Sequence, residues 1–241
     1  MCVAGLAGFR IEPYSRTCSS LFARDGGGYI CITRPRRFGK TVNARMLASF
    51  LTRGLDAAPL FEGLEVSRDP AGMAHLGAHE VIYIDFSAPP DECGSYRDYI
   101  DAIRVGLVND LRAFAPEAGV ESGAGQFAVL ERVYDTAKAR FCFIIDEWDS
   151  MFFNPLFTED DQRALLMFLK QLLKTKSHVE LAYMTGVLPI VKHSTGSEPN
   201  MFVEYSAVED PHYDRFFGFI QDEMRELCAR HLARTPDEQV G

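Results

Sequence analysis

Closely spaced metal ligands are the first thing that this sequence lacks. It contains six cysteines, no two of them close together, and Cys31 and Cys142 lie inside apolar runs. A cysteine in such a run behaves as a small hydrophobic residue, so neither a disulfide framework nor a zinc site is expected. The six histidines also lack the spacing of metal ligands, so we predict no metal site beyond the Mg²⁺ site described below. A reducing, cytoplasmic environment is the corresponding expectation.

Long apolar runs and an excess of positive charge are missing as well. No run approaches the ~20 residues of a membrane-spanning helix, and residues 1–9 lack the basic region of a secretory signal. The net charge is -9, which argues against nucleic-acid binding through the overall charge of the protein. Binding through a local basic patch is still compatible with this charge. With 47% hydrophobic and 24% charged residues, the 241-residue chain is typical of a globular protein with a sizeable core.

Apolar, strand-like runs alternate with helix-length segments along the chain. The predicted strands are 29–33, 81–86, 141–145, 179–185 and 201–208. The predicted helices are 42–52, 96–113, 126–138, a helix capped by Thr158, and 218–232. Inner strands that are apolar throughout indicate an α/β fold, a parallel sheet covered on both faces. Such sheets bind ligands at the carboxyl ends of their strands.

A tight loop follows the first predicted strand and ends in Gly39-Lys40-Thr41, directly before a helix. Strand, loop and helix in this order are the context of a phosphate-binding P-loop. Backbone N–H groups of the loop and the helix dipole favour a phosphate at one spot. Gly39 permits close approach, Lys40 reaches the terminal phosphates, and the Thr41 hydroxyl can bind Mg²⁺. The general pattern has a glycine where this chain has Arg34, so Gly-Lys-Thr alone is weak support.

Two carboxylates, Asp146 and Glu147, end the third predicted strand. A buried strand that ends in acids is costly unless they meet a cation or a hydrogen-bond network. In a P-loop protein Asp146 would bind Mg²⁺ and Glu147 would polarise the attacking water. The alternative is a strand that simply ends in solvated acids, and the preceding Gly-Lys-Thr loop makes it less favoured.

Thr185 and Asp85 end two further strands. Thr185-Gly186 stands where a sensor residue would contact the γ-phosphate or the attacking water, although a plain Thr-Gly turn is the favoured interpretation when these two residues are taken alone. For Asp85 the favoured interpretation is a cap for the turn at Ser87.

Three loop arginines, Arg34, Arg36 and Arg37, have three interpretations. They could clamp phosphates, act on a neighbouring subunit, or brace the loop against acids such as Asp149. For Arg36 we favour phosphate contact or bracing. We interpret Arg45 as a solvated residue and Trp148 as a packing residue rather than an adenine platform.

The run Arg34-Pro35-Arg36-Arg37-Phe38-Gly39-Lys40-Thr41 resembles the RPRRFGK[ST] signature of the AAA-ATPase-like family, prokaryotic P-loop proteins often followed by a PD-(D/E)xK nuclease domain. The resemblance extends in order over roughly residues 29–228. It includes the blocks 60–64, 84–87, 144–149, 184–190, 204–206 and 217–228. In this family an arginine in place of the first glycine is the usual form. Residues 1–22 match the family's lead-in poorly, and the chain ends without the nuclease domain, as a natural short form or a fragment would.

The resemblance implies an AAA-like (ASCE) P-loop NTPase fold with three α/β/α layers, a mostly parallel sheet and a short C-terminal helical extension. We divide the chain into a lead-in (1–28), a P-loop core (29–208) and a C-terminal helical segment (209–241). The implied ligands are ATP and Mg²⁺. The predicted site comprises Arg36, Arg37, Phe38, Gly39, Lys40 and Thr41 for the nucleotide, Thr41 and Asp146 for the metal, and Glu147 and Thr185 for catalysis.

The function expected from these residues is ATP binding and hydrolysis. The alternative is a non-hydrolytic, nucleotide-dependent switch or scaffold. A small-molecule kinase is less favoured because Glu147 suits water activation, and a GTPase still less because no Asn-Lys-x-Asp motif occurs. A homo-oligomer is compatible with an AAA-like site, and the sequence identifies no protein partner. No membrane association is expected.

Overall fold

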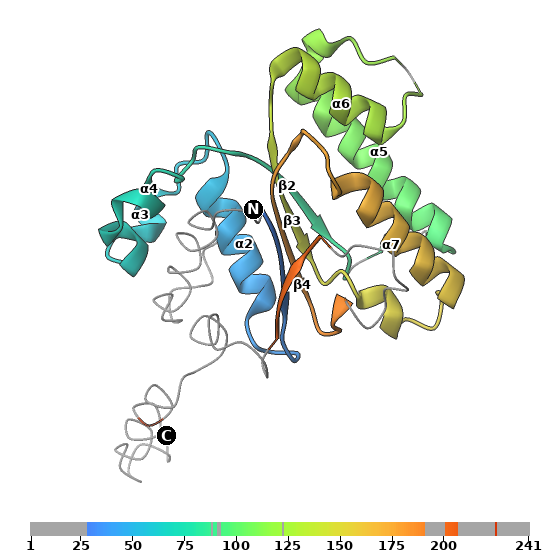
Figure 1. The fold of residues 1–241 in the computed structure, drawn as a ribbon, viewed down its shortest axis with the longest axis horizontal. Coiled ribbons are helices and arrows are strands. Elements are labelled where there is room, and N and C mark those ends of the chain that lie inside the picture. The colour runs from blue at the N-terminus through green and yellow to red at the C-terminus, as the bar shows by residue number, and fades with distance from the viewer. Residues whose placement is uncertain are drawn as a thin grey trace, which may run out of the picture.

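The fold is a five-stranded parallel sheet between layers of helices (Figure 1). The computed structural model describes residues 28–190 except 88, 91, 92 and 122, together with residues 201–206 and Arg225. The strands are β1 (Tyr29–Thr33), β2 (Glu80–Asp85), β3 (Phe141–Asp146), β4 (Val179–Gly186) and β5 (Val203–Ser206). Their order across the sheet is β2-β3-β4-β1-β5, with every pair parallel. The predicted α/β architecture is confirmed.

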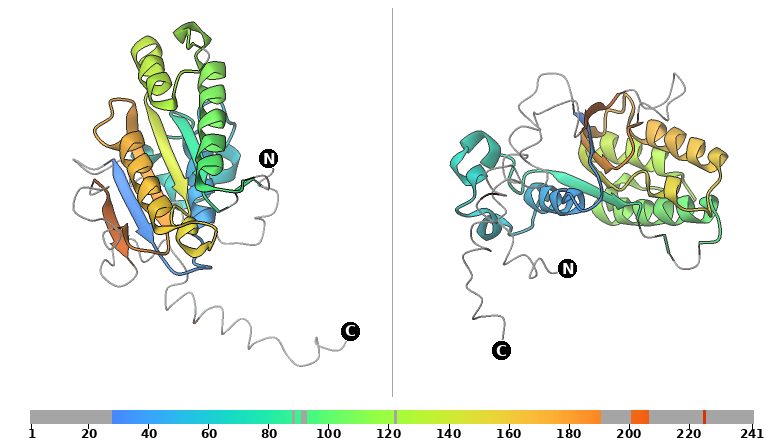
Figure 2. Two further views of the ribbon diagram at one scale, coloured as in Figure 1. Left: turned by 90° about the vertical axis from the view of Figure 1, so that its right-hand side faces the viewer. Right: turned by 90° about the horizontal axis from the view of Figure 1, so that it is seen from below.

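Helices cover both faces of the sheet (Figures 1 and 2). Helix α2 (Lys40–Leu51) covers one face, and α5 (Tyr96–Phe114), α6 (Gln126–Ala137) and α7 (Glu159–Leu173) cover the other. Successive residues of a strand point to opposite faces, so Cys142 and Ile144 join the core under α2, while Phe143 and Ile145 join the core under the other three helices. The sheet is therefore buried on both sides, which explains why β3 is continuously apolar up to Asp146.

The predicted elements occur close to their expected bounds. Strands expected at 81–86, 141–145 and 179–185 occupy 80–85, 141–146 and 179–186, and the strand expected at 201–208 is present at 203–206. Helix α7 begins with a capping box: Thr158 accepts from the Asp161 N–H, and the Asp161 carboxylate accepts from the Thr158 N–H. Helix α2 begins two residues earlier than predicted, because Gly39 already serves as its N-cap.

Short helical turns were not predicted. They are α3 (Ala58–Phe61), η1 (Glu65–Arg68), α4 (Pro70–Met73), η2 (Pro116–Ala118) and η3 (Ser150–Phe153). Three or four residues are too few to show a hydrophobic period. The predicted lead-in and the helix at 218–232 lie outside the described residues, apart from Gly28 and Arg225, and the domain division stays a prediction. None of the helices in the described part of the chain is long and apolar enough to cross a membrane.

The parallel arrangement brings the carboxyl ends of all five strands to one edge of the sheet. Strand β4 lies between β1 and β3, so the loop after β1 and the acids after β3 flank the end of β4. In register, Thr33 pairs with Gly186 and with Ser206, and Asp85 pairs with Asp146. The residues expected to form a site are therefore brought together by topology.

Candidate functional site

The loop from Arg34 to Gly39 connects β1 directly to α2. Gly39 adopts a left-handed conformation (φ 77°) as the helix N-cap, and its carbonyl accepts from the Asn43 N–H at 2.9 Å. Arg37 also has a positive φ of 72°. A non-glycine residue in this region costs roughly 1–2 kcal/mol and persists where the surrounding structure imposes it, often at functional sites. The loop thus holds a specific, strained shape without its first glycine.

Lys40 places its ammonium group inside this loop. The side chain is buried, and Nζ donates to the carbonyl oxygens of Arg34 (2.9 Å) and Pro35 (3.0 Å). Burial lowers the pKa of Lys40, while the carboxylates of Glu147, Asp149 and Asp146 act in the opposite direction. The loop therefore surrounds a desolvated cation that faces three acids.

The arginines of the loop separate into two kinds. Arg34 is only 2% exposed, and its Nη1 donates to the carbonyl oxygens of Thr33 and Tyr205, each at 3.0 Å. Bracing was one of the three interpretations, and Arg34 makes these contacts with carbonyls of β1 and β5 because it leaves β1 beside the end of β5. Arg36 and Arg37 are exposed, and the Arg36 guanidinium lies 5.2 Å from the centre of the Phe153 ring. Arg34 thus stabilises the loop, whereas Arg36 and Arg37 face outward.

Asp146 is a fully buried carboxylate at the end of β3. Its Oδ1 accepts from the Thr185 hydroxyl of β4, and its Oδ2 accepts from the Tyr83 hydroxyl of β2 at 3.1 Å. These two bonds offset part of the cost of burying the charge. Sequence reasoning missed Tyr83. The only signal was its position two residues before Asp85, which places both side chains on one face of β2.

Glu147 leaves the strand in a left-handed conformation (φ 49°) and is half-buried. Its N–H donates to Thr185 Oγ1 at 3.3 Å, so one hydroxyl contacts both acidic residues. Burial raises the pKa of Glu147, with a further increase from Asp146, while Lys40 lowers it. Glu147 therefore binds a proton more tightly than an ordinary glutamate does, as suits a group that accepts a proton.

Asp149 and Trp148 support the same edge of the sheet. Asp149 Oδ2 accepts from the N–H groups of Val187 (2.8 Å) and Leu188 (2.6 Å), which fixes the turn after β4. Burial raises the pKa of Asp149, and these two hydrogen bonds lower it. Trp148 is completely buried and packs edge-on against Phe152, in agreement with its interpretation as a packing residue.

Asp85 caps a turn, as the sequence indicated. Its Oδ1 accepts from the Ser87 N–H at 2.8 Å, and its Oδ2 lies 3.8 Å from Arg45 Nη2. The Arg45 side chain is 66% exposed, consistent with a solvated residue.

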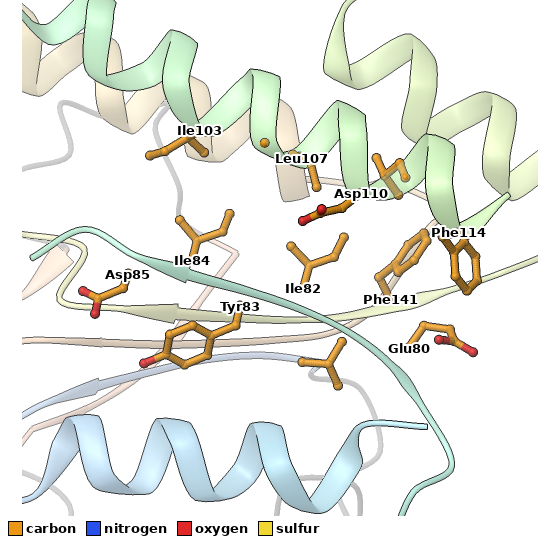
Figure 3. Close-up of a pocket in the computed structure, with 13 residues that line it drawn as sticks. Glu80, Ile82, Tyr83, Ile84, Asp85, Ile103, Leu107, Asp110, Phe114 and Phe141 are labelled. Carbon is orange, nitrogen blue, oxygen red and sulfur yellow. The ribbon is translucent and has the colours of Figure 1, made fainter. Parts of the chain in front are cut away.

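A groove of about 350 Å³ lies between β2 and α5 (Figure 3). Ile82 and Ile84 point into it toward α5, whereas Tyr83 points to the α2 side of the sheet (Figure 3). None of residues 34–41 or 146–149 lines this groove. The candidate site is therefore the open edge formed by the loop and the strand ends, and not this groove.

Comparison with protein families agrees with this geometry. A family model described as predicted AAA-ATPase (AAA-ATPase-like) matches residues 21–195. The chain belongs to the AAA-ATPase-like family. Its α/β fold is accordingly that of a P-loop NTPase, and the loop after β1 and the acids after β3 both lie within the matched region. Family membership supports an AAA-like ATP-binding module.

Other comparisons add little. No curated protein matches the chain. A solved structure of the ORC2 protein from Aeropyrum pernix, determined as ADPNP–ADP complexes, is similar at 13% sequence identity and a TM-score of 0.35. The match covers 82% of this chain but only 46% of the ORC2 chain. A similarity at this level supports no conclusion about function or assembly.

Gly186 provides a test of how tightly the site is packed. A Cβ atom at this position would clash with Trp148 Nε1 and lie 2.7 Å from Cδ1 of the same ring. We expect Gly186→Ala to lower the free energy of unfolding by about 1–3 kcal/mol, because a buried ring has to shift. Urea unfolding measures the change. Gly106→Ala in α5, where no atom lies within 4 Å of the new Cβ, is the matched control and should be neutral or stabilising. Equal stability of Gly186→Ala and the unmodified chain would contradict the packing.

The raised pKa of Glu147 predicts that Glu147→Gln and the unmodified chain differ in stability in a way that depends on pH. Because the folded protein holds this proton more tightly than the unfolded chain does, the contribution of Glu147 to stability is largest below its unfolded pKa of about 4.3 and is lost as the pH rises through the folded value. Glutamine does not ionise, so Glu147→Gln avoids this pH-dependent loss of stability. The variant should match the unmodified chain near pH 4 and unfold at a higher temperature at pH 7. Glu62→Gln, at an exposed position, controls for removal of one negative charge. A lower midpoint for Glu147→Gln at pH 7 would refute the prediction.

Proposed function

We propose that this chain is an ATPase module that binds Mg²⁺-ATP at the carboxyl edge of its sheet and directs water at the γ-phosphate. One observation carries the proposal: the buried Lys40 ammonium lies inside the loop after β1 and interacts electrostatically with Asp146, Glu147 and Asp149. The negative charge of bound phosphates would draw the Lys40 ammonium away from the loop carbonyl oxygens that it contacts in this structure. A lysine on one side and a carboxylate pair on the other is the arrangement that P-loop hydrolysis uses.

The residues present fit a Mg²⁺ ion. Mg²⁺ prefers oxygen ligands, and it is bound through one or two protein groups together with substrate phosphates. Asp146 supplies a carboxylate whose orientation is fixed by Tyr83 and Thr185, and Thr41 supplies a hydroxyl in the first turn of α2. Three carboxylates around one lysine also leave an excess of negative charge. When bound, Mg²⁺ would neutralise charge on the phosphate oxygens.

The other roles follow from the positions of the side chains. Backbone N–H groups from Arg36 to Thr41 would donate to the phosphates, with Gly39 allowing close approach. Glu147 would accept a proton from the attacking water, for which its raised pKa is suited. Thr185 contacts both Asp146 and Glu147, so we assign it the positioning of these acids, while its direct contact with the γ-phosphate stays a prediction.

Arg36 and Arg37 are exposed, and two kinds of binding partner are compatible with this position. Each guanidinium is accessible either to a phosphate of the same site or to a second copy of the chain. A homo-oligomer in which one copy completes the site of its neighbour is therefore part of the proposal. Turnover that rises with protein concentration, together with a larger mass in the presence of ATP, would support it.

Nucleotide binding and phosphate release, measured on the full chain with its oligomeric mass, test the proposed function. We expect ATP to bind, phosphate release to require Mg²⁺, and EDTA to abolish release without unfolding the protein. Tight binding with no turnover, even with DNA present, would favour the switch or scaffold hypothesis. Failure to bind any nucleotide would refute both.

A further inference from the structure

A second group of polar side chains lies at the opposite, amino-terminal end of the sheet. It consists of His79, which directly precedes β2, Cys142, the second residue of β3, and Glu180, the second residue of β4. One ligand atom from each lies within 4.8 Å of the others. Asp146 lies four positions after Cys142 on β3, which is about 13 Å along a strand. This group is thus distinct from the candidate ATP site.

An irregularity in the sheet places Glu180 in this group. Phe141 pairs with Val179, but the next residue, Cys142, pairs with Leu181, so Glu180 is an extra residue on β4. Phe141 and Val179 belong to the core under α5–α7, whereas Cys142 and Leu181 belong to the core under α2. A bulge re-aims the side chain of the extra residue, and such bulges are over-represented beside active sites. Here it brings a carboxylate beside a buried thiol, which the core packing by itself does not require.

His79 is fixed by bonds on both sides. Its N–H donates to Leu51 O at 2.9 Å, and its carbonyl accepts from the Arg53 N–H at 2.8 Å. His79 is 8% exposed, with its Nδ1 3.2 Å from Glu180 Oε2 and its Nε2 2.9 Å from His75 Nδ1. A histidine that binds a metal through one nitrogen commonly uses the other to bond a second residue, which sets its orientation. His75 occupies that second position.

We propose that His79, Cys142 and Glu180 form a binding site for a divalent transition-metal ion of the zinc class, with His75 orienting His79. Imidazole nitrogen, thiolate sulfur and carboxylate oxygen are all ligands of Zn²⁺, and the sulfur disfavours Mg²⁺ and Ca²⁺. Tetrahedral ligation at about 2.0–2.3 Å requires ligand atoms roughly 3.3–3.8 Å apart, so binding draws these three atoms together by about 1 Å. The Glu180 side chain, 31% exposed, has the freedom to move by this amount and leaves the fourth position open to water.

Binding would connect the start of three neighbouring strands. Burial raises the pKa of the Cys142 thiol, and Glu180 raises it further, so the metal-free thiol is neutral and gives up its proton to the solvent when the ion binds. Since His79, Cys142 and Glu180 come from β2, β3 and β4 or their immediate flanks, a bound ion would hold these strands together. The metal should then stabilise the folded chain in proportion to its occupancy.

Titration of the full chain with Co²⁺ alone and with Zn²⁺ alone tests the site. We expect one ion per chain, a thiolate-to-Co²⁺ charge-transfer band, and a rise in thermal midpoint with Zn²⁺. Cys142→Ser should abolish the band, and His79→Asn or Glu180→Gln should weaken binding. His75→Asn should weaken it about 10–100-fold, as is usual for a residue that orients a ligand.

Two controls separate this site from other cysteines. Cys31→Ser removes an equally buried thiol of β1 and should keep the band. Joint replacement of the remaining cysteines Cys2, Cys18, Cys93 and Cys228 by serine should also keep it. Circular dichroism checks that each variant folds. If Cys142→Ser does not fold, the Zn²⁺ affinity of Glu180→Gln, measured by calorimetry, tests the site instead, because this side chain is partly exposed. No band in the unmodified chain, a band that survives Cys142→Ser, or unchanged Zn²⁺ affinity in Glu180→Gln would overturn the proposal.

Discussion

Glu147→Gln should release phosphate from ATP about 10²–10⁴-fold more slowly than the unmodified chain, the range in which general acid–base catalysis contributes. Glutamine keeps the size and shape of the side chain and the backbone N–H that donates to Thr185. It loses only the capacity to accept a proton from water. ATP binding should therefore persist, since Lys40 and the loop are unaltered. Single-turnover phosphate release, measured beside equilibrium binding of ATP, separates the two effects.

Glu62→Gln is the control for this variant, because it removes a carboxylate at an exposed position outside the site. It should hydrolyse ATP at the unmodified rate. Equal turnover by Glu147→Gln would remove the proposed role of Glu147 and leave the ATP-binding site intact. Loss of both binding and turnover would instead show that Glu147 is needed to form the site.

Lys40→Met should weaken ATP binding by roughly 30- to 3,000-fold. Truncating one member of a buried, hydrogen-bonded charge pair costs about 2–5 kcal/mol, and each 1.4 kcal/mol is tenfold in affinity. Methionine approximates the length of the lysine stem but cannot donate to phosphate oxygens. It also leaves Asp146, Glu147 and Asp149 without the cation that faces them, which adds repulsion toward an anionic ligand. Equilibrium binding of ATP with Mg²⁺ present measures the loss.

Lys138→Met, at the exposed end of α6, is the matched lysine control and should bind ATP normally. Zn²⁺ binding by Lys40→Met should also be unaltered if the two proposed sites are separate. Unweakened ATP binding by a folded Lys40→Met would contradict the proposed phosphate site, whatever the metal titration shows.

Strand and helix positions were largely predictable because their signals are local. Apolar runs such as 141–146 identify buried strands, and Thr158 with Asp161 marks the start of α7. The short turns between α2 and β2 carry no period and were missed. The loop residues Gly39, Lys40 and Thr41 and the acids Asp146 and Glu147 could be proposed as site residues from the sequence, because motif spacing and strand ends are visible in one dimension.

Contacts between distant residues were not predictable in the same way. Arg34 donates to the carbonyl of Tyr205, a residue 171 positions away, and Tyr83 reaches Asp146 across 63 positions. Neither pair has a sequence signature, because strand order decides which residues meet. The histidines and cysteines show no ligand spacing along the chain, yet the sheet brings His79 and Cys142 together with Glu180.

The sequence by itself determined the family, the parallel α/β class and the residues that the loop and the acidic strand end contribute. These features depend on local propensity, hydrophobic pattern and motif spacing. Only the tertiary structure decided that Arg34 is buried as a brace, that Thr185 connects Asp146 with Glu147, and that a bulge at Glu180 brings a carboxylate to Cys142 and His79. The physical reason is that register and strand order place side chains across the sheet, and one extra residue in a strand changes which face a side chain meets.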